Sequence, residues 1–308
     1  MTVSIGLGLM EFPFDGAAGF WRWVDMCEQG GVDSLWQTDR IVSRTPILES
    51  MTTMAALAGR TRRLKFGMNV VSLAFRDPVL LAKQCATIDM LSEGRLLPAF
   101  GIGSPLSPEW KALGIDTKTR ASKTDEALDV MRRLWREDSV THQGRHFQLD
   151  DASILPRPVQ PELPIWIGGS SEAAIRRTAR IGTGWIAGAE PAEEAGRVAA
   201  AIRAAATQAG RRIDEDHFGA GFPFHFGTAA DIAPAMAAYH ARTGRDPASY
   251  FAVGDAPAIL AHIRAYVDAG ISKFILRPIG AEAEILAQTG RLIHDLLPLA
   301  AAAWPRHA

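Results

Sequence analysis

The chain has 308 residues, of which 47% are hydrophobic, and its 33 basic side chains nearly balance 34 acidic ones. A net charge of −1 excludes the electrostatic footprint that nucleic-acid binding requires. The hydrophobic content argues against a disordered chain, and a single α/β barrel of about 250 residues or more is compatible with this length.

The sequence gives no sign of membrane association, a disulfide framework or a metal site. The apolar stretch 296–304 is too short to span a bilayer. The N-terminal segment has no positively charged region and soon reaches Glu11 and Asp15, which is typical of a first strand and not of a signal peptide. Cys27 and Cys85 have no second Cys or His at metal-ligand spacing. We therefore expect a soluble, cytoplasmic protein with reduced, packed thiols.

Short apolar runs rich in β-branched residues alternate with longer segments of helical spacing, which is the pattern of βα units around a parallel sheet. Eight such runs predict strands, at residues 3–9, 32–37, 64–71, 96–102, 164–167, 184–187, 218–226 and 272–276. Eight units favour a (β/α)8 TIM barrel, and a doubly wound open sheet is the alternative.

Two stretches depart from the βα pattern. Residues 140–162 contain three prolines, at 156, 158 and 161, and predict an inserted hairpin and extended loop between units four and five. Residues 243–254 form a second irregular stretch that interrupts unit seven. We expect one TIM-barrel domain over residues 1–308 that carries both insertions.

A barrel places its chemistry at the carboxyl ends of the strands, which is where candidate residues are expected. The segments that follow the predicted strands are Met10 and Glu11, 38–40, 69–72, 101–104, 168–171, 187–190, His225 and Arg277. Apolar side chains near these ends, including Phe12, Phe14, Trp110 and Phe224, suggest a mostly apolar ligand.

The clearest local feature is a buried strand that runs through Gly168, Gly169, Ser170 and Ser171 directly into a helix. Glycines allow a phosphate to approach the backbone, and the N–H groups at the helix N-terminus point toward it. The alternative is that one of the serines only caps the helix in a tight turn. Arg277 closes the last strand on the same face, where barrels often hold phosphate.

Other familiar site patterns are missing from the sequence. Gly101 and Gly103 follow a strand, but Leu106 stands where the dinucleotide fingerprint has its third glycine. The phosphate-binding loop of nucleotide triphosphatases, the serine-hydrolase GxSxG and the zinc-peptidase HExxH are all absent.

Four polar residues could serve either function or packing. Asn69, the only asparagine, ends strand three, where it either caps backbone groups or points into the barrel mouth. His225 ends an aromatic strand and is either an acid or base at the mouth or a satisfied core histidine. Asp39 and Arg40 end strand two, where they either belong to the site or form an ion pair that only stabilises the loop.

A longer series of residues resembles the bacterial luciferase-like monooxygenase family. It comprises Arg76–Lys83, Ala86–Arg95, Gly101–Gly103, Asp125–Leu128, Leu134–Trp135, Gly144, Pro156–Pro158, Pro164–Ser170 and Gly182–Trp185. The matches occur in order and with family-like spacing over most of residues 1–190, whereas only the strand and helix pattern agrees from about residue 215 onward.

The resemblance implies a (β/α)8 barrel with FMN or the deazaflavin F420 as a loosely held reduced cosubstrate, and commonly a homodimer. It implies that the cofactor phosphate lies at the turn after strand five and that the ring lies over the end of strand three, with a cis peptide bond at Asn69–Val70. The candidate cofactor-binding residues are Asn69, Val70, Gly101, Gly103, Gly168, Gly169, Ser170, Ser171, Gly188 and Arg277, the candidate catalytic residues are Arg40 and His225, and the candidate substrate-binding residues are Met10, Glu11 and Trp110.

One position departs from the family pattern. Many relatives carry histidine where this chain has Arg40, and an arginine stays protonated and cannot act as a general base. Arg40 can instead hold an anionic group or stabilise a developing negative charge.

Together these features predict a flavin-dependent monooxygenase that uses reduced FMN and O2 on a small, mostly apolar substrate. A separate flavin reductase would supply the electrons, since no NAD(P)H-binding fingerprint is present. The alternatives are an F420-dependent dehydrogenase or reductase that transfers hydride, and a non-catalytic flavin-binding barrel.

Overall fold

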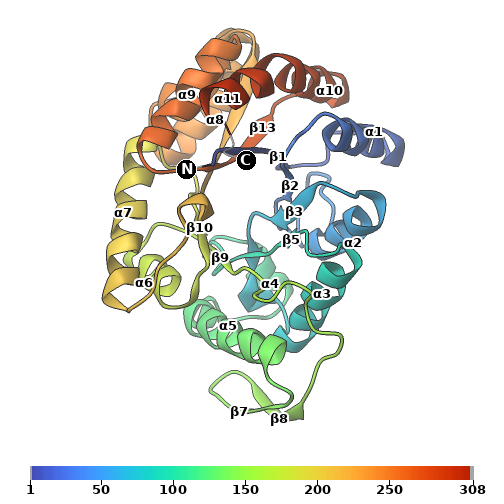
Figure 1. The fold of residues 1–308 in the computed structure, drawn as a ribbon, viewed down its shortest axis with the longest axis vertical. Coiled ribbons are helices and arrows are strands. Elements are labelled where there is room, and N and C mark those ends of the chain that lie inside the picture. Colours follow the sequence, from blue (N-terminus) through green and yellow to red (C-terminus); the bar gives the residue numbers. More distant parts are fainter. Residues whose placement is uncertain (1, 306–308) are drawn as a thin grey trace.

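A computed structural model describes residues 2–305, in which parallel strands close into a barrel with helices around it (Figure 1). The barrel strands are β1 (Ser4–Leu9), β2 (Ser34–Gln37), β3 (Lys65–Met68) with β4 (Val71–Ser72), β5 (Leu96–Leu97) with β6 (Ala99–Gly101), β9 (Trp166–Gly168), β10 (Gly184–Ile186), β11 (Phe218–Phe226) and β13 (Lys273–Pro278). The hydrogen-bonded order is β4-β6-β9-β10-β11-β13-β1-β2-β3-β5. Since β3 runs on into β4 and β5 into β6, the two ends of this order meet. Each predicted run contains a barrel strand, and the predicted TIM barrel is confirmed.

The helices alternate with the strands and cover the outside of the barrel. They are α1 (Ala17–Gln29), α2 (Ser50–Arg60), α3 (Pro78–Leu91), α4 (Glu109–Ala112), α5 (Arg120–Arg136), α6 (Glu172–Ile181), α7 (Ala192–Gln208), α8 (Ala233–Thr243), α9 (Ala256–Asp268), α10 (Glu282–Arg291) and α11 (Leu297–Ala303), with a π-helical turn at Leu292–Leu296. Side-chain caps fix several starts: the carboxylates of Asp77 and Asp255 accept from backbone N–H groups in the first turns of α3 and α9.

Two barrel strands are interrupted at single points. Pro98, which has no N–H to donate, separates β5 from β6, although its carbonyl still accepts from the Trp166 N–H at 3.1 Å. The cis peptide bond at Asn69–Val70 separates β3 from β4 and lies where the resemblance predicts it. β13 extends two residues past its predicted end, so that Arg277 lies within the strand and not after it.

The two irregular stretches contain strands of their own. β7 (Val140–Gln143) and β8 (Gln148–Ala152) form an antiparallel hairpin that projects from the barrel beside α5 (Figure 1). β12 (Ala252–Gly254), which the eight-strand prediction missed, pairs with the end of β11. Phe224 of β11 pairs with both Pro278 and Ala252, so β12 lies on the side of β11 away from β13.

The barrel interior is filled by two tryptophans, each of which faces a glycine. A Cβ on Gly67 would lie 2.7 Å from the Trp36 ring, and a Cβ on Gly184 would lie 2.6 Å from the Trp166 ring. The two indoles meet edge to face, with their centroids 6.3 Å apart. Large rings therefore fit inside the barrel only because the facing strands carry no side chain at these positions.

A buried ion pair lies at the amino-terminal end of the barrel. Lys273 Nζ, at the start of β13, donates to the Asp33 carboxylate at 2.6 Å, and both side chains are about nine-tenths buried. Burial lowers the pKa of Lys273, and the charge of Asp33 opposes that effect. Loss of either partner would leave an uncompensated buried charge, which costs about 3–5 kcal/mol.

None of the helices described in the structure has a run long and apolar enough to cross a membrane.

His262 on α9 has a partly buried imidazole that packs against two aromatic rings. Its ring centroid lies 4.8 Å from that of Phe222 and 5.6 Å from that of Tyr266. Its Nε2 atom is buried without a hydrogen-bond partner among the described residues. Burial disfavours the charged form and lowers the pKa of His262 to about 4.

The lowered pKa of His262 predicts that the free energy of unfolding falls at acid pH. Between pH 6.5 and about 4 the unfolded chain binds a proton at residue 262 that the native chain does not, so the free energy of unfolding falls by up to about 1.4 kcal/mol per pH unit. Urea denaturation at pH 7.5 and pH 5 should show a smaller acid loss in His262→Leu than in the wild type, whereas His294→Leu at an exposed site should behave as wild type. Equal acid losses in all three proteins would contradict this role.

Candidate functional site

A cavity of about 950 Å³ opens at the carboxyl ends of the barrel strands. Every one of the eight strands, or the loop that follows it, contributes to its lining. Most of the predicted site residues line it: Met10, Glu11, Arg40, Asn69, Val70, Gly101, Gly103, Gly168, Gly169, Gly188 and Arg277. Ligand cavities commonly measure about 300–1,000 Å³, so this one is large enough for a cofactor-sized ligand.

Val70 forms the base of the cavity. A Cβ on Gly101 would lie 2.7 Å from Val70 Cγ2, and a Cβ on Gly168 would lie 3.0 Å from Val70 Cγ1. The Val70 side chain therefore lies between β6 and β9, and each of these strands needs a glycine where it faces the valine. Asn69, beside it, makes no side-chain hydrogen bond to any described residue, so its amide is available to a ligand in the cavity.

The turn after β9 leads into the N-terminus of α6. Gly169 adopts φ +105°, a conformation that favours glycine, and its carbonyl accepts from the Trp185 indole at 2.8 Å. Ser171 caps the helix by accepting from the Ala174 N–H at 3.3 Å. The first N–H groups of a helix have no acceptor within it, so those of Glu172 and Ala173 remain available to an anion.

The two serines of this turn are not placed as the sequence prediction supposed. The Ser170 hydroxyl donates to the carboxylate of Glu190, a buried side chain on the β10–α7 connection, and the Ser171 hydroxyl serves the cap. Neither serine lines the cavity. A phosphate here would therefore be held by backbone N–H groups and not by the Ser170 hydroxyl, because Glu190 already binds that hydroxyl.

The loop after β2 presents Arg40 to the cavity with its charge uncompensated. The neighbouring Asp39 is bound by Arg76 through two contacts of 2.7 Å, so it does not neutralise Arg40. The Glu109 carboxylate fixes the next residues by accepting from the N–H groups of Ile41 and Val42, at 3.1 and 3.3 Å. The Arg40 guanidinium itself has no acceptor among residues 2–305.

Burial alone would raise the pKa of Glu109. Hydrogen bonds from the Ser107 hydroxyl and from the backbone N–H groups of Ile41 and Val42 instead hold that pKa below its ordinary value. A charged, hydrogen-bonded carboxylate thus anchors the loop that carries Arg40.

Tyr250 lines the opposite side of the cavity, and sequence reasoning missed it. Its hydroxyl donates to the Gly221 carbonyl at 2.9 Å and accepts from Arg277 Nη1 at 3.0 Å. Its ring stacks on Tyr239 with centroids 4.7 Å apart. In the sequence, Tyr250 stands out only because it lies in the irregular stretch 243–254, to which the barrel pattern assigns no strand or helix.

His225 and Trp110 do not line the cavity, contrary to expectation. His225 lies at the rim, where its Nδ1 contacts Gln288 Nε2 at 3.1 Å and its Nε2 lies 3.4 Å from the Asp231 carboxylate. Trp110 is 5% exposed and donates to the Ser104 carbonyl at 2.7 Å. The indole therefore supports the loop after β6 from behind, and the imidazole is engaged by polar neighbours outside the cavity.

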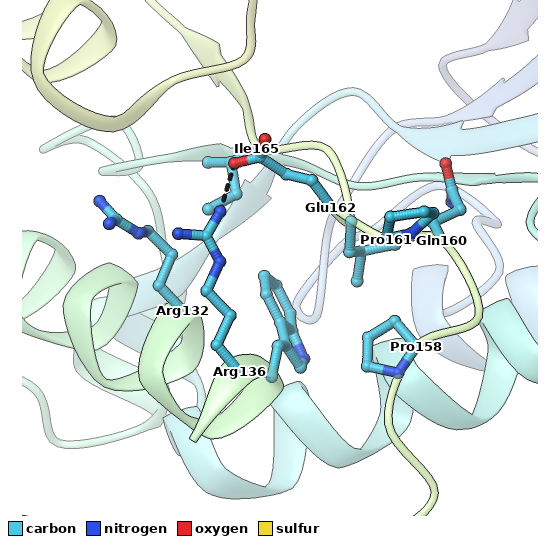
Figure 2. Close-up of a pocket in the computed structure, with 9 residues that line it drawn as sticks. Arg132, Arg136, Pro158, Gln160, Pro161, Glu162 and Ile165 are labelled. Carbon is cyan, nitrogen blue, oxygen red and sulfur yellow. Dashed lines mark hydrogen bonds and ion pairs between the residues drawn. The ribbon is translucent and has the colours of Figure 1, made fainter.

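A second, small hollow lies at the other end of β9 and is too small for an organic ligand. Figure 2 shows its lining, in which Arg136 of α5 is paired with Glu162 of the segment between β8 and β9. Its volume of about 20 Å³ is close to that of one water molecule. The large cavity is thus the better candidate for function.

The barrel, and a cavity built from all eight strand ends, define the class of the molecule as a TIM-barrel protein with a small-molecule site. The family model for luciferase-like monooxygenases matches residues 13–295, and the chain belongs to that family. Members of this family include flavin-dependent and F420-dependent oxidoreductases and monooxygenases.

The similar proteins include some named for F420 and one solved with FMN. It is 31% identical over 172 residues to an F420-dependent glucose-6-phosphate dehydrogenase of Amycolatopsis mediterranei, which covers 52% of this chain and 50% of that protein. Monooxygenase RslO1 of Streptomyces bottropensis superimposes with a TM-score of 0.83 at 22% identity, over 96% of this chain and 99% of that one. A Baeyer–Villiger monooxygenase component of Pseudomonas putida in complex with FMN gives 0.77 at 18%, over 97% and 99%.

The matches to the first curated relatives span little more than half of each protein's length. The similarity in sequence therefore supports the family, and the similarity in structure supports the fold.

The contact between Val70 and its facing glycines generates a mutational prediction. Gly101→Ala places a methyl group 2.7 Å from Val70, so we expect a loss of about 1–3 kcal/mol of unfolding free energy in urea. Val70→Ala in the same chain should restore much of that loss, because it removes the clashing methyl groups. Gly59→Ala on α2, where nothing lies within 4 Å, serves as the control and should be neutral or stabilising. The account fails if Gly101→Ala is as harmless as Gly59→Ala.

Proposed function

We propose that this protein is a flavin-dependent monooxygenase that takes reduced FMN and O2 as cosubstrates and oxidises a small, mostly apolar organic molecule. One observation carries the choice: among the described residues that line the cavity there is no histidine, cysteine or lysine, and Glu11 is the only carboxylate. Such a lining suits a reaction in which the cofactor supplies the chemistry and the protein binds, orients and excludes water.

The residues present fit a flavin. Val70 and its facing glycines offer an apolar surface for a ring, and the Asn69 amide can donate and accept beside it. The N-terminus of α6 can hold the phosphate through backbone N–H groups. Reduced FMN, when bound, supplies the electrons that activate O2, and a separate flavin reductase would deliver it.

Arg40 acts electrostatically in this proposal. Its permanent positive charge, with no acceptor in the described structure, can stabilise negative charge that develops in the cavity or bind an anionic group of the substrate. It cannot take up a proton. His225 lies outside the cavity, so we withdraw it as the residue that handles protons.

The second candidate is an F420-dependent oxidoreductase that transfers hydride. The curated relative from Amycolatopsis mediterranei favours it. In that case a base is needed to take the proton of an alcohol, and Glu11 is the one carboxylate in the cavity lining that could do so.

Binding and oxygen uptake separate these candidates. Titration of the purified protein with anaerobically reduced FMN and with F420, followed by absorbance, should show binding of reduced FMN, and addition of air with candidate apolar ketones or alkanes should give substrate-dependent O2 consumption. Binding of F420 without FMN would replace the proposal by hydride transfer. Flavin binding with neither reaction would indicate a non-catalytic flavin-binding barrel.

Arg40→Ala tests the electrostatic role. We expect turnover or substrate affinity to fall at least tenfold while the Kd for FMN changes less than twofold, because the charge is lost but the Val70 base and the α6 turn are intact. Arg44→Ala, in the same loop but outside the cavity lining, is the control and should match wild type. A large loss of FMN binding in Arg40→Ala would contradict the assignment.

A further inference from the structure

One face of α8 covers part of the cavity. Ala235, Ala238, Tyr239 and Arg242 line it, and their spacing of three, four and seven residues places them on one side of the helix. Tyr239 is the only fully buried residue of α8, where its hydroxyl donates to the Ala189 carbonyl at 3.2 Å. The helix thus presents two small side chains, one ring and one cation to whatever occupies the cavity.

Arg242 has no hydrogen-bond or ion-pair partner among residues 2–305, although its guanidinium carbon lies 6.0 Å from the centroid of the Tyr239 ring. Its neighbour Arg245 differs, because Arg245 Nη2 contacts both oxygens of Glu194 at 2.7 and 2.8 Å and Nη1 donates to the Ala189 carbonyl. Arg245 therefore fixes the loop after α8, while the charge of Arg242 remains open to a ligand.

The net charge of the cavity lining also favours an anionic ligand. Arg40, Arg242 and Arg277 line it, and Glu11 is the one acidic residue of the described lining. Two carboxylates outside the lining, Asp39 and Glu194, are bound by Arg76 and Arg245. A third, Glu190, lies behind Gly188 and accepts from the Ser170 hydroxyl. A cavity with this imbalance attracts anions.

We propose that Arg242 is an anion-binding residue at the mouth of the cavity, which holds a carboxylate or phosphate group of a molecule bound against the α8 face. A guanidinium binds either group through paired N–H donors. The anionic group can belong to the side chain of the cofactor or to the substrate, and the two sources are separated by experiment. The inference rests on the proposed function only in the cofactor case.

The test compares anionic ligands with neutral counterparts, measured as Kd by fluorescence or calorimetry. The cofactor pairs are FMN with riboflavin, and F420 with its deazaflavin core lacking phosphate and glutamyl tail. The substrate pair is decanoate with decan-1-ol. We expect Arg242→Gln to weaken the anionic member of at least one pair tenfold or more and its neutral member less than twofold, with Arg242→Lys in between.

Arg197→Gln on α7 is the control, because it removes an exposed charge, paired only with Glu193, far from the cavity lining. It should leave every Kd unchanged. A loss confined to a cofactor pair assigns the group to the cofactor, and a loss confined to the decanoate pair assigns it to the substrate.

The proposal is overturned if Arg242→Gln leaves all anionic ligands within twofold of wild type, or weakens neutral and anionic members equally. Failure of the proposed function has a different signature, since wild-type protein would then not bind reduced FMN, whatever Arg242 does with F420 or decanoate.

Discussion

The architecture depends on bulky side chains that cross the barrel interior and on the glycines that face them. Trp36 and Trp166 fill the lower interior against Gly67 and Gly184, and Val70 continues the pattern above them against Gly101 and Gly168. Because a close-packed interior has no spare volume, each bulky residue requires the absence of a side chain opposite. The same packing thus places the apolar Val70 side chain in the lining of the cavity above.

The two ends of the barrel differ in whether their charged side chains are paired. The amino-terminal end is closed by the buried Lys273–Asp33 pair, whose charges satisfy each other. At the carboxyl end Arg40 and Arg242 carry charges that no described residue satisfies, while Arg76 and Arg245 hold the adjacent loops through carboxylates. Paired charges therefore position the loops, and unpaired charges face the space that a ligand would fill.

The barrel and much of the cavity lining could be predicted from the sequence because both follow local rules. Strand periodicity located every barrel strand, and the rule that sites lie at the carboxyl strand ends brought Arg40, Val70 and Gly168 together. The α8 face could not be predicted, since its contact with the cavity depends on how Tyr239 docks. The sequence also could not show that Asp231 and Gln288 lie beside His225, because no spacing rule specifies how these side chains are oriented. The same holds for the contact between Ser170 and Glu190.

We propose that a flavin ring lies on Val70 and its facing glycines, with its phosphate at the N-terminus of α6. A crystal structure of the protein with bound FMN tests this most directly. The account predicts the ring in contact with Val70 and the phosphate within hydrogen-bond distance of the backbone N–H groups that begin α6. A ring bound away from Val70, or a phosphate that makes no contact with the N-terminus of α6, would contradict it.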